Sequence, residues 1–276
     1  MKLIFKIPLH LSSVLLSSAL LWGSTALADI AISPMVIETQ AKRGQTQGYI
    51  TVYNQERNTF RARVYTSPFT YDHENGFQTL TSSPNDLSRY IQFSPRELEV
   101  PGTAKRRIRF IVRFPPSLPD GEYRTMIFTE NLQTSTVTQT DATNNNVKFQ
   151  TTIIPRIGVA VYVRKGDISP NLIPNSARLN PQGQIQLLVQ NKGKASAIVG
   201  GNWTIKQGSQ VIKTGAINNT TVIAEGERYL SVDSLNKNQP KLKLSPGEYK
   251  LSGELGWGEN NKNKIPFSVN LTVPKK

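Results

Sequence analysis

The sequence predicts an all-β protein built from β-sandwich domains. Apolar residues alternate with polar ones over short runs, the pattern of strands with one buried face. Gly, Pro, Asn and Asp separate these runs at intervals of about 8–15 residues. After the first part of the chain, no segment keeps the 3.6-residue period of an amphipathic helix. Short strands separated by regular turn signals are typical of sandwiches.

The chain begins with features of a secretory signal peptide over residues 1–28. Lys2 and Lys6 give a positive start, Leu9–Leu21 is apolar and Ser-rich, and Ala26–Ala28 forms a small-residue cleavage site. No later run reaches the roughly 18 apolar residues that a membrane-spanning helix needs. We therefore expect export, cleavage after Ala28, and a periplasmic mature chain without a transmembrane segment.

A cluster of Gly, Pro and Asn that follows Arg164 predicts a domain boundary between residues 29–166 and 167–276. In the first domain we expect strands at Ile30–Thr39, Gly48–Asn54, Arg61–Ser67, Ser88–Phe93, Lys105–Phe114, Tyr123–Asn131 and Val147–Arg164. In the second domain we expect strands at Gln184–Gln190, Ala197–Lys206, Val211–Gly215, Tyr229–Val232, Glu248–Gly256 and Phe267–Val273.

The composition argues against an enzyme. The chain has no cysteine, so it has no disulfide, thiolate metal site or cysteine nucleophile. Its two histidines are His10, in the leader, and His73, in a stretch that reads as a turn. Carboxylates are too scattered for a paired acid–base site. We therefore expect no catalytic residue, no metal and no cofactor.

The segment Lys105–Phe114 is a strongly basic strand within a chain of net charge +14. Ile108, Phe110, Val112 and Phe114 alternate with Lys105, Arg107, Arg109 and Arg113. The apolar row predicts a core face. The basic row is either a solvated face that prevents edge-to-edge pairing or a surface that binds an anionic polymer. Export makes nucleic acid an unexpected partner.

The segment Val147–Arg164 is the longest expected strand and follows a polar tract, Gln133–Asn146, that reads as a hairpin loop. Pro155 indicates an edge strand or a bulge, because proline cannot donate a ladder hydrogen bond. An edge strand can add to the sheet of another protein. The residues that would project toward such a partner are Val147, Phe149, Thr151 and Ile153. The alternative is an ordinary strand whose apolar row faces its own core.

Residues Ile30–Arg164 resemble the N-terminal domain of the periplasmic chaperones of chaperone–usher pilus assembly. The order and spacing of several segments carry the resemblance. These are Ile32-Ser33-Pro34, Gly48–Asn54, Phe93–Gly102, the basic strand ending in Arg113, Leu118–Arg124, Phe128–Glu130 and the final long strand.

The resemblance implies two immunoglobulin-like sandwiches in a boomerang arrangement. It also implies a function in fimbrial biogenesis, by donor-strand complementation of pilin-like or other secreted subunits. The last strand of the first domain would complete a subunit that lacks a strand, and an outer-membrane usher would be a further partner. The strand is then exchanged without nucleotide hydrolysis.

The sequence departs from this family where the subunit's terminal carboxylate would be held. The family uses an Arg and a Lys, and the matching positions here are Val36 and Gly158. Arg156, on the same strand face as Gly158, is the candidate substitute. We also expect Arg164 to pair with Glu130 and to fix the angle between the domains.

Two functional classes remain open from the sequence. One is a chaperone for pilus or surface-fibre subunits. The other is a non-enzymatic, envelope-associated binding or structural protein that contacts anionic surface polymers through its basic face, with a role in cell-wall organisation. The neutral residues at the expected anchor favour the second class, and the predicted edge strand favours the first.

Overall fold

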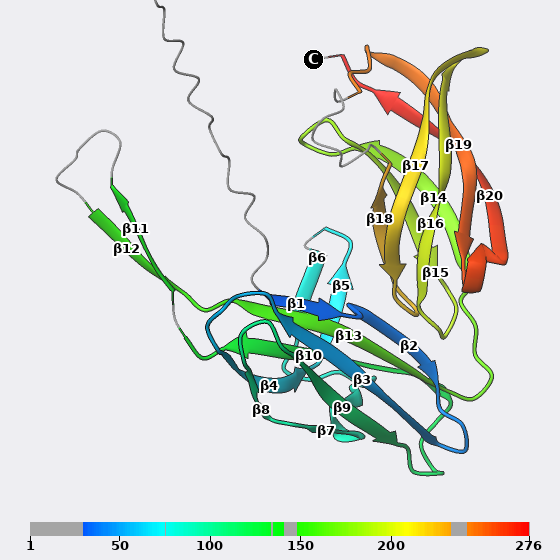
Figure 1. Cartoon of the computed structure of the whole chain (residues 1–276). Coiled ribbons are helices and arrows are strands. Elements are labelled where there is room, and N and C mark those ends of the chain that lie inside the picture. Colours follow the sequence, from blue (N-terminus) through cyan, green and yellow to red (C-terminus); the bar gives the residue numbers. More distant parts are fainter. Residues whose placement is uncertain (1–29, 75, 134, 141–147, 233–241, 276) are drawn as a thin grey trace, which may run out of the picture.

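A computed structural model describes residues 30–74, 76–133, 135–140, 148–232 and 242–275. The expected signal peptide lies outside these residues. The described chain is all-β, with two short 3₁₀ turns, η1 (Leu87–Arg89) and η2 (Glu259–Asn261), between strands (Figure 1). Within the described ranges, no helix is long and apolar enough to cross a bilayer.

The first sandwich consists of two sheets. One has the order β1 (Ile30–Ser33), β3 (Gln45–Asn54), β9 (Lys105–Arg113) and β7 (Ile91–Ser94). The other has the order β2 (Val36–Gln40), β13 (Arg156–Lys165), β10 (Gly121–Asn131), β4 (Phe60–Ser67) and β8 (Glu97–Val100). The core between them includes Ile50, Val52, Ile108, Phe110, Val112, Val159, Val161 and Val163. The alternating residues of both sheets thus meet as the sequence pattern predicts.

Two hairpins extend from this sandwich. One is β5 (Phe69–Asp72) with β6 (Gly76–Thr79), and the other is β11 (Ser135–Thr140) with β12 (Lys148–Ile153). The β5–β6 hairpin points toward the second sandwich, whereas β11–β12 projects away from the body of the molecule (Figure 1). The described parts of β11 and β12 pair only with each other.

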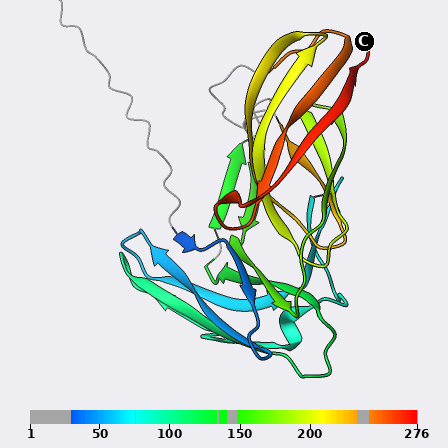
Figure 2. The same ribbon diagram turned by 90° about the vertical axis from the view of Figure 1, so that its right-hand side faces the viewer.

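The second sandwich also has two sheets. One has the order β14 (Leu172–Leu179), β15 (Ile185–Asn191) and β18 (Glu227–Ser231). The other has the order β17 (Gln210–Val222), β16 (Ala197–Gln207), β19 (Gly247–Trp257) and β20 (Asn263–Val273). Its separate core includes Leu187, Val189, Trp203, Ile205, Leu251 and Leu271. The two sandwiches lie at an angle to each other, in the boomerang arrangement expected from the sequence (Figure 2).

Several sequence predictions about strands need correction. The segment Ser88–Phe93, expected to be one strand, begins within the 3₁₀ turn η1, and β7 starts only at Ile91. The segment Ile30–Thr39 divides into β1 and β2, and the chain passes from one sheet to the other at Ser33–Pro34. The segment Val147–Arg164 divides at Ile154–Pro155 into β12 and β13. Strand β11 lies in the tract that was expected to be a hairpin loop, although all of its residues except Val137 are polar. At Pro34 and Pro155 the missing N–H removes a ladder donor where each strand divides.

The basic strand β9 forms as predicted. Ile108, Phe110 and Val112 are almost fully buried, and the basic residues that alternate with them are exposed. Burial of each large apolar side chain contributes about 1.5–3 kcal/mol, which fixes the register of the strand.

Candidate strand-binding edge and domain junction

Strand β13 has an open edge along its first half. It pairs with β10 over its length on one side, from Arg156 to Lys165. On the other side it pairs with β2, in parallel, only from Ala160 to Arg164. Residues 156–159 therefore have no partner strand on that side within the described chain. Strand β12 precedes these residues. Within the described chain it pairs with β11 on one side, and its other side is unpaired.

Exposed apolar side chains border this edge. Ile153 and Ile154 are 47% and 51% exposed, at the junction of β12 and β13. Leu132, 52% exposed, follows β10 at the base of the β11–β12 hairpin, and Met35, 49% exposed, accepts a hydrogen bond from Ala160 through its carbonyl. Single exposed apolar residues are ordinary, but several around one unpaired backbone edge indicate a binding surface.

The predicted row of donor residues is divided by the structure. Val147 lies outside the described residues, and Phe149 is described only as a backbone position of β12. Thr151 and Ile153 are exposed. In β13 the same row continues with Ile157, which is half-buried, and with Val159, Val161 and Val163, which are all in the core of the first sandwich. The interpretation as an ordinary core strand thus holds for β13, and Thr151 and Ile153 stay available to a partner.

The opposite face of β13 lies against a second apolar cluster. Its buried members come from both sandwiches and are Phe69, Met126, Phe128, Ala160, Tyr162 and Ile223. Val36 packs against the same cluster. A Cβ atom at Gly158 would lie 2.8 Å from Met126 Sδ and 2.9 Å from Phe128 Cε1. The two positions expected for a carboxylate anchor are therefore occupied by close apolar packing.

Arg156 lies at the open end of β13 and is exposed. Its guanidinium is 4.6 Å from the centre of the Phe128 ring, and Nη1 donates a hydrogen bond to Tyr65 Oη at 3.3 Å. A guanidinium has five N–H donors in a fork that matches a carboxylate. Among the described residues this side chain forms one hydrogen bond, so donors are left for a ligand.

The expected pair between Arg164 and Glu130 is wrong. Strands β10 and β13 are antiparallel, and their register places Glu130 opposite Arg156 and Glu122 opposite Arg164. Glu130 instead accepts hydrogen bonds from Tyr65 Oη at 2.7 Å and Arg63 Nε at 2.9 Å. The bond from Tyr65, with that from Arg63, holds the pKa of Glu130 below its usual range.

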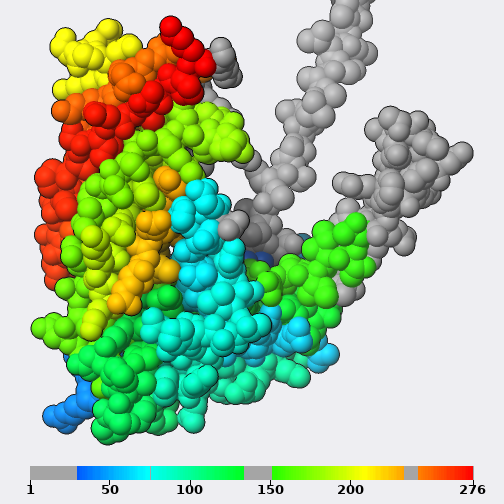
Figure 3. Space-filling model, turned by 180° about the vertical axis from the view of Figure 1, so that it is seen from behind, coloured from blue at the N-terminus to red at the C-terminus, as the bar shows by residue number. Residues whose placement is uncertain are grey.

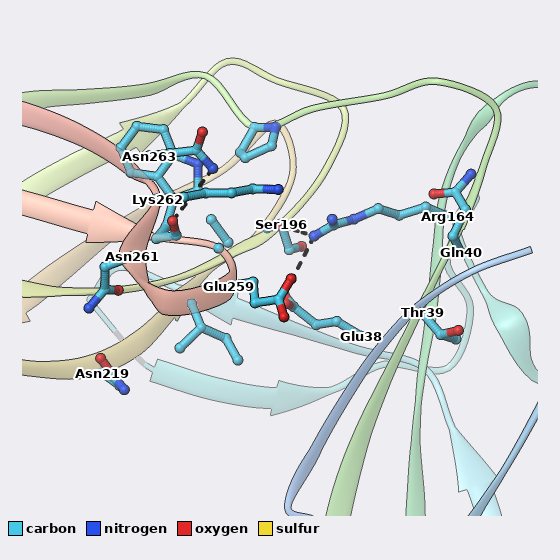
Figure 4. A pocket seen from close by; sticks show the side chains of 15 residues that line it. Glu38, Thr39, Gln40, Arg164, Ser196, Asn219, Glu259, Asn261, Lys262 and Asn263 are labelled. Atoms are coloured by element: carbon cyan, nitrogen blue, oxygen red, sulfur yellow. Dashed lines mark hydrogen bonds and ion pairs between the residues drawn. The ribbon is translucent and has the colours of Figure 1, made fainter.

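Arg164 joins the two sandwiches through a different set of partners, which we call the junction network: Glu38, Glu122, Arg164 and Ser196. Glu122 is buried and accepts from the Ser196 N–H at 2.8 Å and from the Ser196 hydroxyl. Arg164 Nη2 donates to the Ser196 carbonyl at 2.7 Å, and Nε lies 3.5 Å from Glu122. Figure 4 shows Arg164 reaching toward Ser196 and Glu38.

Glu38, Arg164 and Ser196 of the junction network form one wall of a hollow between the sandwiches, with a volume of about 550 Å³. Glu259 and Lys262 of the second sandwich also line it (Figure 4). Burial raises the pKa of Glu38 above its usual range, against the opposing effect of Arg164. Acidic and basic groups both line the hollow, and Arg164 is already bound to Ser196, Glu38 and Glu122. We therefore interpret the hollow as part of the contact between the two sandwiches and not as a ligand site.

The β5–β6 hairpin makes a second contact between the sandwiches. Glu74 receives two hydrogen bonds from Arg178, at 2.8 and 3.0 Å, and these bonds lower the pKa of Glu74. Beside them, His73 Nδ1 lies 3.1 Å from Glu227. In the space-filling view from behind, the cyan hairpin lies against the second sandwich (Figure 3). His73, expected in a turn, thus takes part in a domain contact.

Sequence reasoning missed Glu122, Ser196 and Arg178. Each finds its partner far along the chain, such as the 74 residues that separate Glu122 from Ser196. The available signal was a charged residue, Glu122, within the largely buried strand β10, where Arg124 is a second buried charged residue. A buried carboxylate requires hydrogen-bond partners, but the sequence does not say which ones.

Comparison with known proteins finds no matching family model and no matching curated protein. Among solved structures, the YadV chaperone is 12% identical with a TM-score of 0.47, and the match covers 88% of this chain and 100% of that one. The class 5 fimbriae chaperone CfaA is 14% identical with a TM-score of 0.46, covering 89% and 100%.

A third solved structure is the CsuC–CsuE chaperone–tip subunit pre-assembly complex, from archaic chaperone–usher Csu pili of Acinetobacter baumannii. It is 15% identical with a TM-score of 0.46, covering 89% of this chain and 100% of that one. These structures are of the class that the sequence resembles.

Proposed function

We propose that this chain is a periplasmic chaperone, without enzymatic activity, for a secreted β-sheet subunit that lacks a strand. The clients would be of the pilin or surface-fibre kind. The observation that carries the proposal is the open edge formed by β12 and residues 156–159, bordered by exposed Ile153 and Ile154. An open edge offers unpaired N–H and C=O groups, and alternating side chains give specificity.

Each contact at the open edge is expected to contribute little to the free energy of client binding, but the contacts of the whole edge add up to a substantial contribution. Each added ladder hydrogen bond contributes about 1 kcal/mol net. Burying the exposed half of an isoleucine contributes about 1 kcal/mol, half of the value for a complete side chain. Several such contacts together provide binding that a subunit could later exchange for the strand of another subunit.

Arg156 supplies the charged end of the proposed site. It is exposed, it has unused donors, and it lies at the start of β13, where the open edge begins. A charge-assisted contact with the terminal carboxylate of a client would contribute roughly 1.5–3 kcal/mol. Val36 and Gly158 take no part in it, because both are packed against the apolar cluster.

The proposal extends to processing and domain organisation. A leader at residues 1–28 is removed after Ala28 during export. Residues 29–166 form the domain that binds the client, and residues 167–276 form the second domain. An outer-membrane usher then receives the bound subunit. The support is the leader pattern in the sequence and the separate cores of the two sandwiches.

The test compares clients captured from a periplasmic extract by the parent chain and by matched variants. Ile153→Asn/Ile154→Asn should lose a set of β-rich surface subunits identified by mass spectrometry. Val211→Asn, which alters a valine 50% exposed in the second sandwich, should retain them. Binding should also slow hydrogen exchange of the amides of residues 156–159.

A second arm of the same test concerns the charged end. Arg156→Ala should weaken binding of a captured client about tenfold, the equivalent of 1.4 kcal/mol. Arg107→Ala, on the opposite sheet, should leave that binding unchanged. The proposal fails if both isoleucine changes leave the captured set intact, or if bound clients protect no amide of the open edge.

A further inference from the structure

The outer face of the sheet β1-β3-β9-β7 carries a row of cations that the proposed client site does not use. The outward basic residues of β9 are Lys105, Arg107, Arg109 and Arg113. Alternate residues of a strand lie about 6.8 Å apart, so the row extends over roughly 27 Å. The row lies on the sheet opposite to the one that holds the open edge.

No acidic residue of the two neighbouring strands, β3 and β7, lies beside this row. The other outward-facing residues on the neighbouring strands are uncharged: Gln45, Gln47, Tyr49, Thr51, Tyr53, Gln92 and Ser94. Elsewhere in the described chain, Arg61, Arg63, Arg164 and Arg178 each pair with a carboxylate. The cations of β9 form no such ion pair with the described residues. Their positive potential is therefore uncompensated and extends into solvent.

Neighbouring side chains hold several of these cations in place. The Arg107 guanidinium lies 4.4 Å from the centre of the Tyr49 ring, and Lys105 Nζ lies 5.2 Å from that of Tyr53. Arg113 donates to Gln92 Oε1 at 3.2 Å. At one end of the row, four basic side chains, Lys105, Arg106, Arg107 and Arg109, line a hollow of about 580 Å³ together with Thr51, Ser94 and Pro95.

We propose that this face binds a linear acidic polysaccharide laid along β9. A row of four cations along one strand, interrupted only at Ile111, fits a polymer with repeated negative charges better than a single small anion, which would contact one or two of them. The amides and hydroxyls beside the row, such as Gln47, Gln92 and Thr51, match the hydroxyl groups of sugars.

Two other polyanions fit the face less well. A protein that binds a membrane surface inserts large apolar side chains into it. Among the large apolar residues that are exposed in the described chain, only Tyr49 lies on this face. Single-stranded nucleic acid stacks its bases on aromatic rings, whereas here Tyr49 and Tyr53 each already have a cation against the ring. The expected leader also directs the chain away from nucleic acid.

The test measures binding of the full mature chain to polygalacturonate, a linear carboxylated glycan. Arg107→Gln/Arg109→Gln/Arg113→Gln should weaken binding at least tenfold. The matched control is Lys192→Gln/Lys194→Gln/Lys250→Gln, which removes the same charge from exposed lysines of the second sandwich. It should change binding less than twofold. Raising the salt to about 0.5 M shortens the screening length to roughly 4 Å and should abolish binding by the parent.

Two comparisons decide between the possible partners. Parallel titrations use an oligothymidylate and vesicles that contain phosphatidylglycerol. The proposal fails if either binds tenfold more tightly than polygalacturonate, or if the control variant loses as much affinity as the β9 variant. Equal unfolding temperatures show that both variants fold, and Arg107→Glu alone serves as a second test, expected to weaken binding at least threefold. Unchanged client capture by the β9 variant separates this site from the open edge.

Discussion

Strands β12 and β13 continue one alternating row, which is exposed at Thr151 and Ile153 in β12 but buried at Val159, Val161 and Val163 in β13. Val161 in β13 is fully buried, whereas Ile153 in β12 is 47% exposed. The chain leaves the body of the sandwich at Ile154–Pro155, and within the described residues β12 pairs with β11 alone. Alternation therefore shows which residues share a face, but it does not show what covers that face.

The largest expected effect comes from the same type of substitution placed in the two strands. Val161→Asn removes buried methyl groups and leaves an amide without partners, so it should lower the free energy of unfolding by about 4 kcal/mol. Ile153→Asn should change it by less than about 0.5 kcal/mol. Urea unfolding followed by circular dichroism measures both. Equal losses would mean that β12 packs against the chain's own core.

A smaller effect is expected where β13 ends at the junction network. Glu122→Gln removes the charge that faces Arg164 and one acceptor from Ser196, at a cost of about 2 kcal/mol. The control is Glu99→Gln, because Glu99 forms an exposed ion pair with Arg61 that contributes little. Amide exchange at Ser196 should become faster only in Glu122→Gln. A protected Ser196 amide in that variant would contradict the role given to the network.

The smallest effect is a pH dependence at Glu38, in the strand that covers the second half of β13. Burial raises the folded-state pKa of Glu38 above 4.5. The folded chain then binds this proton more tightly than the unfolded chain, so the parent loses stability as the pH rises from 4.5 through the raised pKa.

Glu38→Gln lacks this titration, so its unfolding free energy should fall less than that of the parent between pH 4.5 and pH 7. Chemical unfolding at several pH values measures the difference. Parallel curves for the two proteins would show that the Arg164 partner fully offsets the burial of Glu38.

The sequence predicts the strand-rich fold because alternation and turn residues are local signals. It identifies the core face of β9 correctly for the same reason, since Ile108, Phe110 and Val112 belong to one continuous row. The division of the first strand at Ser33–Pro34 was not predicted, because both parts begin with apolar residues and only the pairing partners differ.

The candidate site could be predicted only in part. Thr151 and Ile153 were placed on a possible binding face, and the structure leaves both exposed. The partner of Arg164 was not predictable, because the register of β10 against β13 selects Glu122 over Glu130. Register depends on how the turn between two strands is built, and here that turn includes the separate β11–β12 hairpin, which sequence alone does not specify.

The parallel pairing of β2 with β13 also has a mechanical consequence. Five residue pairs, from Val36 opposite Ala160 to Gln40 opposite Arg164, join the two strands. Tension between the start of β2 and the second sandwich pulls at opposite ends of this parallel pair. The load is then shared by all of its backbone hydrogen bonds in shear, and they must break together instead of opening one after another. Strand β2, which leaves the first half of β13 unpaired on one side, thus also resists mechanical extension of the chain.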